Sequence, residues 1–274
     1  MSIMAIAKDQ AGDLIRRRYL IVILIVCIGI VAMWIGYLAL MKTFMLKAAT
    51  TPNASGKLPS AQEMQQMSQL MVSGLQASLH ALVTFIGVML AVALMAYSVR
   101  SEIAKGTIRM VLSRPVRRYE LVIGKWLGCT FILFLYMVLM GILVSGYTYF
   151  AFHSLPAIVV VSIAMGFLKA ITVGTLGLAF SMIIHPLLSI VIAYYMGAEL
   201  FLNIAGFLGG AWKQVILAPF YILPSYGAFD VYKLMMQGIS LKPADIAYRV
   251  AYGLLLTAIG LLLSIAAFRK KDLI

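Results

Sequence analysis

The chain has 274 residues, of which 63% are hydrophobic and only 11% are charged, and its mean hydropathy is +1.01. Soluble proteins average about 25% charged residues, so this composition excludes a soluble globular protein and predicts an all-α integral membrane protein. The formal net charge of +13 would suit nucleic-acid binding in a soluble chain, but here the basic residues gather where apolar runs end, as membrane topology explains. We therefore expect one membrane domain over residues 1–274 and no nucleic-acid partner.

The N-terminal segment joins an amphipathic stretch to a long uncharged run. Residues 1–18 carry apolar side chains at helical spacing with charged residues around them, a pattern typical of a helix at the membrane interface. Tyr19–Met41 contains no charged residue over 23 positions and can cross a hydrocarbon core of roughly 30 Å. Arg16, Arg17 and Arg18 stand directly before this first span, so we expect the N-terminus in the cytoplasm.

Residues 42–76 are predicted to lie outside the membrane and to hold a helix from about Ser60 through Met71. The methionines Met64, Met67 and Met71 fall at helical spacing, and thioethers can bind copper(I). The same spacing is expected of an amphipathic helix that packs on protein or membrane, and methionine is common throughout this chain. We therefore predict no metal site here.

Five further apolar runs predict five further spans. They are Ala77–Ala96, Trp126–Ala151, Ala157–Ile184, Leu187–Gly209 and Val250–Phe268. The short His185-Pro186 corner makes the fourth and fifth spans antiparallel neighbours. Residues 210–248 are predicted to form a second external segment. They are aromatic and broken by proline, so we expect re-entrant or interfacial helices there rather than a span. Basic residues are denser on the side of both chain ends, which predicts six spans with both termini cytoplasmic in a plasma (inner) membrane.

The most polar stretch between two spans covers residues 97–125, which we call the basic loop. It holds seven of the 22 basic residues, and its acidic residues are Glu102 and Glu120. Short loops rich in Lys and Arg remain in the cytoplasm during insertion. The basic loop is therefore the place where a soluble partner could bind this protein.

The order of residues in the basic loop resembles the signature loop of permease subunits of the ATP-binding cassette (ABC) type-2 family. Along the chain come Glu102, Gly106-Thr107-Ile108, Leu112–Val116, Arg118 and Gly124-Lys125. Both ends of the chain also resemble the ends of that family, so the likeness covers the whole sequence. Many members place a glutamate in the N-terminal helix where this chain has Asp9 and Gln10.

The resemblance implies a permease subunit of an ABC exporter, which forms the substrate pathway with a second copy of this chain or a related permease. The basic loop would couple it to a separate ATP-hydrolysing subunit. The candidate coupling residues are Arg100, Glu102, Gly106, Thr107, Arg114, Pro115, Arg117, Arg118 and Lys125.

Coupling requires short, rigid helices at the membrane surface, and the basic loop predicts two. Ser98–Met110 reads as one helix, with Glu102 near Lys105 and Arg109 on its surface. A proline then breaks it, and a second helix through Lys125 leads into the third span. Alternatively, the charges only anchor a solvated loop, which explains the basic residues but not their ordered pattern.

A phosphate-binding loop of the form G-x4-GK-[ST] is absent from the sequence. The two Gly-Lys pairs, Gly56-Lys57 and Gly124-Lys125, are followed by Leu and Trp. We therefore expect a partner subunit to bind ATP and Mg²⁺ and this chain to hold no cofactor. The three histidines are scattered and paired carboxylates are lacking, so we predict neither a catalytic site nor a metal site.

Two ionisable residues, Lys169 and Glu199, lie near the centres of the predicted fourth and fifth spans. Placing either charge alone in lipid would cost at least about 2.5 kcal/mol. We hypothesise that they pair, or that they face a polar pathway with Asn203, one turn after Glu199. A purely structural pair or a snorkelling lysine explains them equally well.

These intramembrane charges also leave a second functional class open. An ion-coupled carrier or a membrane scaffold would act without ATP and would depend on Glu199 rather than on Glu102. Dependence on a nucleotide-binding partner separates the two classes.

Overall fold

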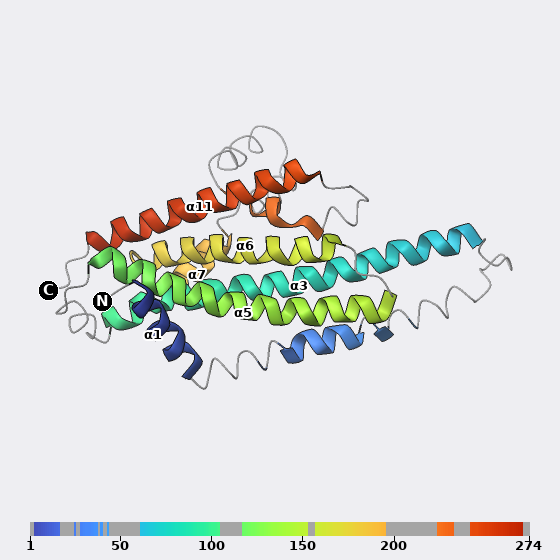
Figure 1. Cartoon of the computed structure of the whole chain (residues 1–274), viewed down its shortest axis with the longest axis horizontal. Coiled ribbons are helices and arrows are strands. Elements are labelled where there is room, and N and C mark those ends of the chain that lie inside the picture. Colours follow the sequence, from blue (N-terminus) through green and yellow to red (C-terminus); the bar gives the residue numbers. More distant parts are fainter. Residues whose placement is uncertain are drawn as a thin grey trace.

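The computed structural model describes residues 3–16, 25, 28–37, 39–40, 43, 61–104, 117–152, 157–195, 224–232 and 242–270. Within these ranges the chain is helical apart from short turns and connecting residues, and long helices lie side by side (Figure 1). The labelled helices are α1 (Ile3–Arg16), α3 (Ala61–Ala104), α5 (Arg118–Phe152), α6 (Ala157–Ser181), α7 (Pro186–Tyr195), the 3-10 helix η2 (Tyr226–Phe229) and α11 (Pro243–Arg269). The predicted all-α fold is confirmed.

Four of the described helices are long and apolar enough to cross a membrane. They cover Gln76–Ile103, Arg118–Phe150, Val159–Ser181 and Pro243–Arg269, at the positions predicted for spans two, three, four and six. Ile28–Tyr37 and Pro186–Tyr195 are shorter apolar helices inside predicted spans one and five. Apart from residues 25, 39 and 40, the remaining parts of those two spans lie outside the described residues.

Helix α3 is one continuous helix of 44 residues, and this corrects the predicted division of its sequence. At 1.5 Å per residue it is about 66 Å long, more than the roughly 30 Å hydrocarbon core needs. The predicted external helix ending at Met71 and the first part of the predicted surface helix Ser98–Met110 both belong to it. Ala61–Ala104 contains no proline, so no residue within it lacks the backbone N–H that a continuous helix needs.

Helices α3 and α6 approach each other closely because glycines on α6 leave room for α3. A Cβ atom on Gly166 would lie 2.7 Å from Thr84 Oγ1, and one on Gly177 would lie 2.6 Å from Val92 Cγ1. Small residues at such positions allow close backbone contact between membrane helices. From the first contact to the second, residue numbers rise along both helices. Helices α3 and α6 therefore run parallel, as Figure 1 shows.

Helix α11 also runs parallel to α6 and packs on it through small and hydroxyl residues. Thr172 and Thr257 lie 3.2 Å apart through their Oγ1 atoms. The helix begins at Pro243, seven residues before the predicted start of span six, because proline is favoured in the first helical turn. Arg249, the residue before the predicted start of span six, therefore lies within α11.

The outward face of α11 carries large apolar side chains. Its leucines Leu254, Leu255, Leu262 and Leu263 are each more than half exposed. Such a row of leucines is expected of a helix surrounded by lipid.

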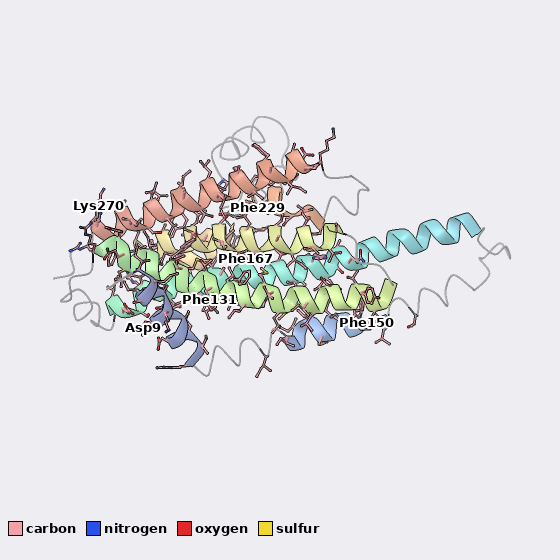
Figure 2. All side chains as sticks on the ribbon, viewed as in Figure 1. Asp9, Phe131, Phe150, Phe167, Phe229 and Lys270 are labelled. Carbon is pink, nitrogen blue, oxygen red and sulfur yellow. The ribbon has the colours of Figure 1, made fainter. Side chains whose placement is uncertain are left out.

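One end of the bundle gathers the segments that flank the basic loop. Helix α3 ends there and α5 begins there, beside α1 and the last turn of α11 near Lys270 (Figures 1 and 2). We call it the loop end and the opposite end the far end. The turn at residues 182–185 and the start of α7 at Pro186 confirm the predicted His185-Pro186 corner between α6 and α7.

Candidate coupling site

Three helices meet around the ammonium group of Lys125 at the loop end. Lys125 Nζ lies 2.5 Å from Glu102 Oε1 and donates a hydrogen bond of 2.8 Å to Gln10 Oε1. Gln10 belongs to α1, Glu102 to α3 and Lys125 to α5. We call these three side chains the Lys125 junction.

The Lys125 junction is largely shielded from water. The Lys125 side chain is 5% exposed and the Glu102 side chain is 28% exposed. An ammonium this deeply buried needs an opposite charge, because removing one partner of a buried pair costs about 3–5 kcal/mol. The junction therefore fixes the ends of α3 and α5 relative to each other and to α1.

Helix α1 docks onto α5 through two glycines four residues apart. A Cβ atom on Gly124 would lie 2.7 Å from Ile6 Cβ, and one on Gly128 would lie 2.8 Å from the Ala7 carbonyl oxygen. Glycines at this spacing allow two membrane helices to touch backbone to backbone. The predicted interfacial helix thus forms over Ile3–Arg16, and one face of it packs against protein.

An apolar cluster lies behind the junction and extends it to α6 and α11. Its buried members are Ile6, Ala11, Leu14, Met95, Val99, Leu121, Val122, Cys129, Ile132, Leu178, Met182 and Phe268. Because these side chains come from α1, α3, α5, the loop end of α6 with its following turn, and α11, a displacement of the α3 or α5 ends is transmitted to every one of these helices.

The other described coupling candidates lie close to the junction. Arg118 donates a hydrogen bond of 3.1 Å to the Arg269 carbonyl oxygen at the end of α11. Arg117 is exposed, and its backbone N–H donates a 3.0 Å bond to Glu120 Oε2, which caps the start of α5. Arg100 lies on α3 and is partly exposed.

The remaining coupling candidates, Gly106, Thr107, Arg114 and Pro115, lie outside the described residues and stay predictions. So do Lys105 and Arg109, the expected neighbours of Glu102. The structure gives Glu102 a partner from another helix, because the chain returns at α5 and brings Lys125 alongside.

Sequence reasoning missed the role of Gln10. Its side chain is buried in an otherwise amphipathic helix, which is unusual for a glutamine unless a partner satisfies it. The Gly124–Gly128 spacing was a second available signal, since it marks a docking face on α5.

The intramembrane lysine has a described carboxylate partner that the sequence does not suggest. Lys169 Nζ lies 2.6 Å from Asp230 Oδ1, in the segment that carries η2. Glu199 and Asn203 lie outside the described residues, so a pair of Lys169 with Glu199 and a polar pathway with Asn203 stay predictions. Sequence reasoning missed Asp230 because it assigns residues 210–248 to an external segment, although it expects a re-entrant path there.

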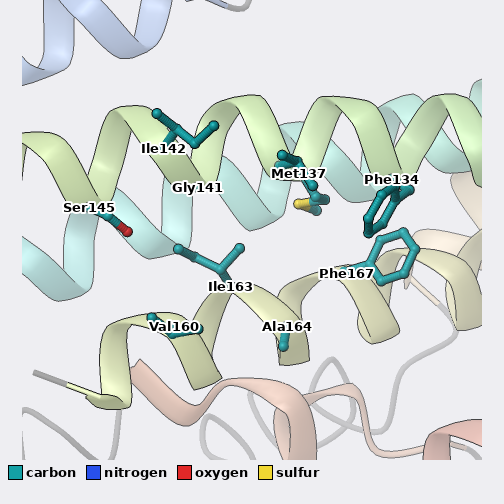
Figure 3. Close-up of a pocket in the computed structure, with 10 residues that line it drawn as sticks. Phe134, Met137, Gly141, Ile142, Ser145, Val160, Ile163, Ala164 and Phe167 are labelled. Carbon is teal, nitrogen blue, oxygen red and sulfur yellow. The ribbon is translucent and has the colours of Figure 1, made fainter.

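An apolar groove on the surface of α5 and α6 contributes nothing to the junction (Figure 3). It has a volume of about 370 Å³, and Phe134 and Phe167 close one end with ring centroids 5.7 Å apart. None of the described side chains that line it is ionisable. Nor do the described residues contain a group of three or more His, Cys, Asp or Glu side chains placed to hold a metal ion.

Comparison with known protein families identifies the family of this chain. The profile of a family described as ABC-2 family transporter protein matches residues 4–273. No curated protein matches the sequence at a significant level. The matched family is a transmembrane permease family rather than a nucleotide-binding one. The chain therefore belongs to the ABC-2 family, as a membrane-spanning permease component of an ABC transporter.

Proposed function

We propose that this chain is the permease subunit of an ABC exporter, that it forms the substrate pathway, and that its basic loop receives the motion of a separate ATP-hydrolysing subunit. Family membership supports the permease component. The observation that carries the coupling step is the Lys125 junction, which ties the two helices flanking the basic loop to α1.

The proposed mechanism follows from the stiffness of the loop end. An ATPase bound at the basic loop moves the end of α3 and the start of α5 together, because the ion pair of Glu102 and Lys125 links them. Gln10 carries that motion to α1, and Arg118 carries it to the end of α11. A set of helices fixed to one another moves as a unit, which is what force transmission requires.

The partner supplies the chemistry of ATP hydrolysis. It binds ATP and Mg²⁺, since the sequence of this chain has no phosphate-binding loop. Two permease chains and two ATPase subunits form the working assembly in the plasma (inner) membrane, with both termini and the basic loop in the cytoplasm. The density of basic residues on that side supports this orientation.

Co-purification with an ATPase activity measurement tests the proposal. The full chain is extracted gently from its native membrane, the accompanying chains are identified, and ATP hydrolysis is measured for wild type and for Glu102→Gln. We expect a chain with a phosphate-binding loop to accompany the wild type. Glu102→Gln should lower the coupled ATPase activity at least severalfold, because the amide cannot neutralise Lys125.

Glu120→Gln is the matched control. It makes the same chemical change in the basic loop, but the side chain caps α5 through a backbone N–H that an amide oxygen also accepts. It should leave the ATPase activity near the wild-type value. Equal losses in both variants, or the absence of any nucleotide-binding chain, would contradict the proposed coupling.

A further inference from the structure

Residues 224–232, which we call the strap, cross between α6 and α11 (Figure 1). Beyond the ion pair of Lys169 and Asp230, hydrogen bonds hold the strap to neighbouring helices. Tyr226 Oη donates a 3.2 Å bond to the Ala193 carbonyl oxygen on α7. Tyr252 Oη on α11 accepts a 2.9 Å bond from the Ser225 backbone N–H. The strap is therefore docked on three helices.

The ion pair draws the strap down to the middle of α6. Lys169 stands twelve residues after Ala157, about 18 Å along the axis of a membrane-length helix. Its side chain is 17% exposed, and that of Asp230 is 6% exposed. At this depth an ammonium without a neighbouring anion is strongly disfavoured.

This requirement links movement of the strap to anion binding. If the strap moves away, Asp230 leaves, and Lys169 must find another anion or stay uncompensated in an apolar setting. An anion that binds Lys169 therefore favours release of the strap, and release of the strap favours that anion. The strap and such a ligand compete for one ammonium group.

The strap itself shows what kind of anion fits. Phe229 directly precedes Asp230 in the strap (Figure 2). Its ring is 2% exposed and stacks on Tyr252 of α11 with centroids 6.0 Å apart. That ring also fills the space left by Gly253, where a Cβ atom would lie 2.9 Å from Phe229 Cε1. The segment that occupies the site thus joins a carboxylate to a large apolar group, and a ligand that replaces it would combine the same two features.

A further polar group holds the backbone of the strap. The Arg249 guanidinium on α11 donates a hydrogen bond to the Ala228 carbonyl oxygen. Departure of the strap would free the Arg249 donors for a ligand as well.

We propose that Lys169 is an anion-binding site at mid-depth of α6, occupied here by Asp230, which takes the carboxylate or phosphate group of an amphiphilic anion when the strap moves away. As a statement about substrate class, it rests on the proposed permease function. The binding step itself concerns the strap and α6 and involves no nucleotide.

A thiol reporter on the strap tests the competition. Val231 has no exposed surface, so Val231→Cys reacts with a membrane-impermeant maleimide only when the strap leaves. The purified full chain, with Cys27 and Cys129 replaced by alanine, is labelled in dodecyl maltoside with added decanoate or decanol. We expect decanoate to raise the labelling rate at least fivefold and decanol, which has the same tail without the charge, to leave it unchanged.

A second reporter excludes general loosening of the bundle. Val99→Cys lies on α3 at the loop end and is equally buried, so its labelling should not respond to decanoate. If decanoate accelerates both reporters alike, or neither, the proposed site is wrong.

Charge variants then test whether the effect of decanoate on labelling depends on the ion pair of Lys169 and Asp230. In Asp230→Asn the Lys169 ammonium has lost the carboxylate that competes with the ligand. Decanoate should therefore act at a concentration at least fivefold lower than in the wild type. In Lys169→Met with Asp230→Asn no charge remains, so decanoate should have no effect. A decanoate response that survives in this double variant overturns the proposal, and the wild-type response still tests it should Asp230→Asn fail to fold.

Failure of this test and failure of the proposed coupling are separable. Labelling uses the chain without ATPase partner or nucleotide, whereas the coupling test reads ATP hydrolysis by the partner. A strap that ignores decanoate leaves the Lys125 junction as proposed, and a chain without an ATPase partner leaves the anion site as proposed.

Discussion

Two lysines, Lys125 buried and Lys169 partly buried, organise this molecule at the scale of single residues. Each pairs with a carboxylate that lies far away in the sequence, at positions 102 and 230. The setting of Lys169 could be anticipated, since it falls inside a predicted span, whereas the sequence places Lys125 in a polar loop. Their partners could not be anticipated, because hydropathy and local spacing do not say which distant segments the packed helices bring together.

The unequal exposure of the partners at the Lys125 junction predicts unequal losses of stability. Glu102→Gln leaves an ammonium that is 5% exposed, so the free energy of unfolding should fall by about 2–3 kcal/mol. Lys125→Met leaves a carboxylate that is 28% exposed and can reach water, so the loss should be about 1 kcal/mol. Denaturant titration of the purified variants measures both.

The double variant completes this comparison. With both charges removed, the loss should be smaller than the sum of the two single losses, because neither charge is left alone. Additive losses, or a larger loss for Lys125→Met than for Glu102→Gln, would show that the pair does not hold the junction together.

At the scale of helices, hydropathy could place the main spans but not their ends. Spans two, three, four and six appear as long helices, yet α3 extends well past the apolar run on both sides and α11 begins seven residues earlier than predicted. The length of an apolar run reports the thickness of the membrane. The end of a helix depends on breakers and caps, such as Pro243 in the first turn of α11.

Docking of α1 on α5 predicts a strong dependence on the two glycines at their contact. Gly128→Ala would place a Cβ atom 2.8 Å from the Ala7 carbonyl oxygen, so backbone must move. We expect the free energy of unfolding to fall by about 1–3 kcal/mol despite the better helix propensity of alanine. Thermal unfolding of the purified chain measures the change.

Gly12→Ala is the matched control for this contact. Gly12 lies on α1, and a Cβ atom added there would meet no other atom within 4 Å, so alanine should stabilise the helix slightly. If Gly12→Ala and Gly128→Ala have the same effect, the close contact between α1 and α5 is not important for stability.

At the scale of the whole molecule, the bundle has a loop end and a far end, and the proposed topology assigns them to opposite sides of the membrane. A thiol-labelling map checks this assignment. Arg117→Cys, an exposed position at the loop end, should react with an impermeant maleimide only after the membrane is opened. Lys242→Cys, exposed at the start of α11, should react in intact cells. The reverse pattern would place the basic loop outside and exclude a cytoplasmic ATPase partner.

Site-specific photo-crosslinking from the loop end tests the central claim most directly. A photoreactive amino acid replaces Arg117, and a second variant carries it at Phe150, which is 81% exposed at the far end (Figure 2). After irradiation of native membranes, we expect the Arg117 position to capture a chain with a phosphate-binding loop and the Phe150 position not to capture it. Capture of the same chain from both positions, or from neither, would contradict coupling through the basic loop.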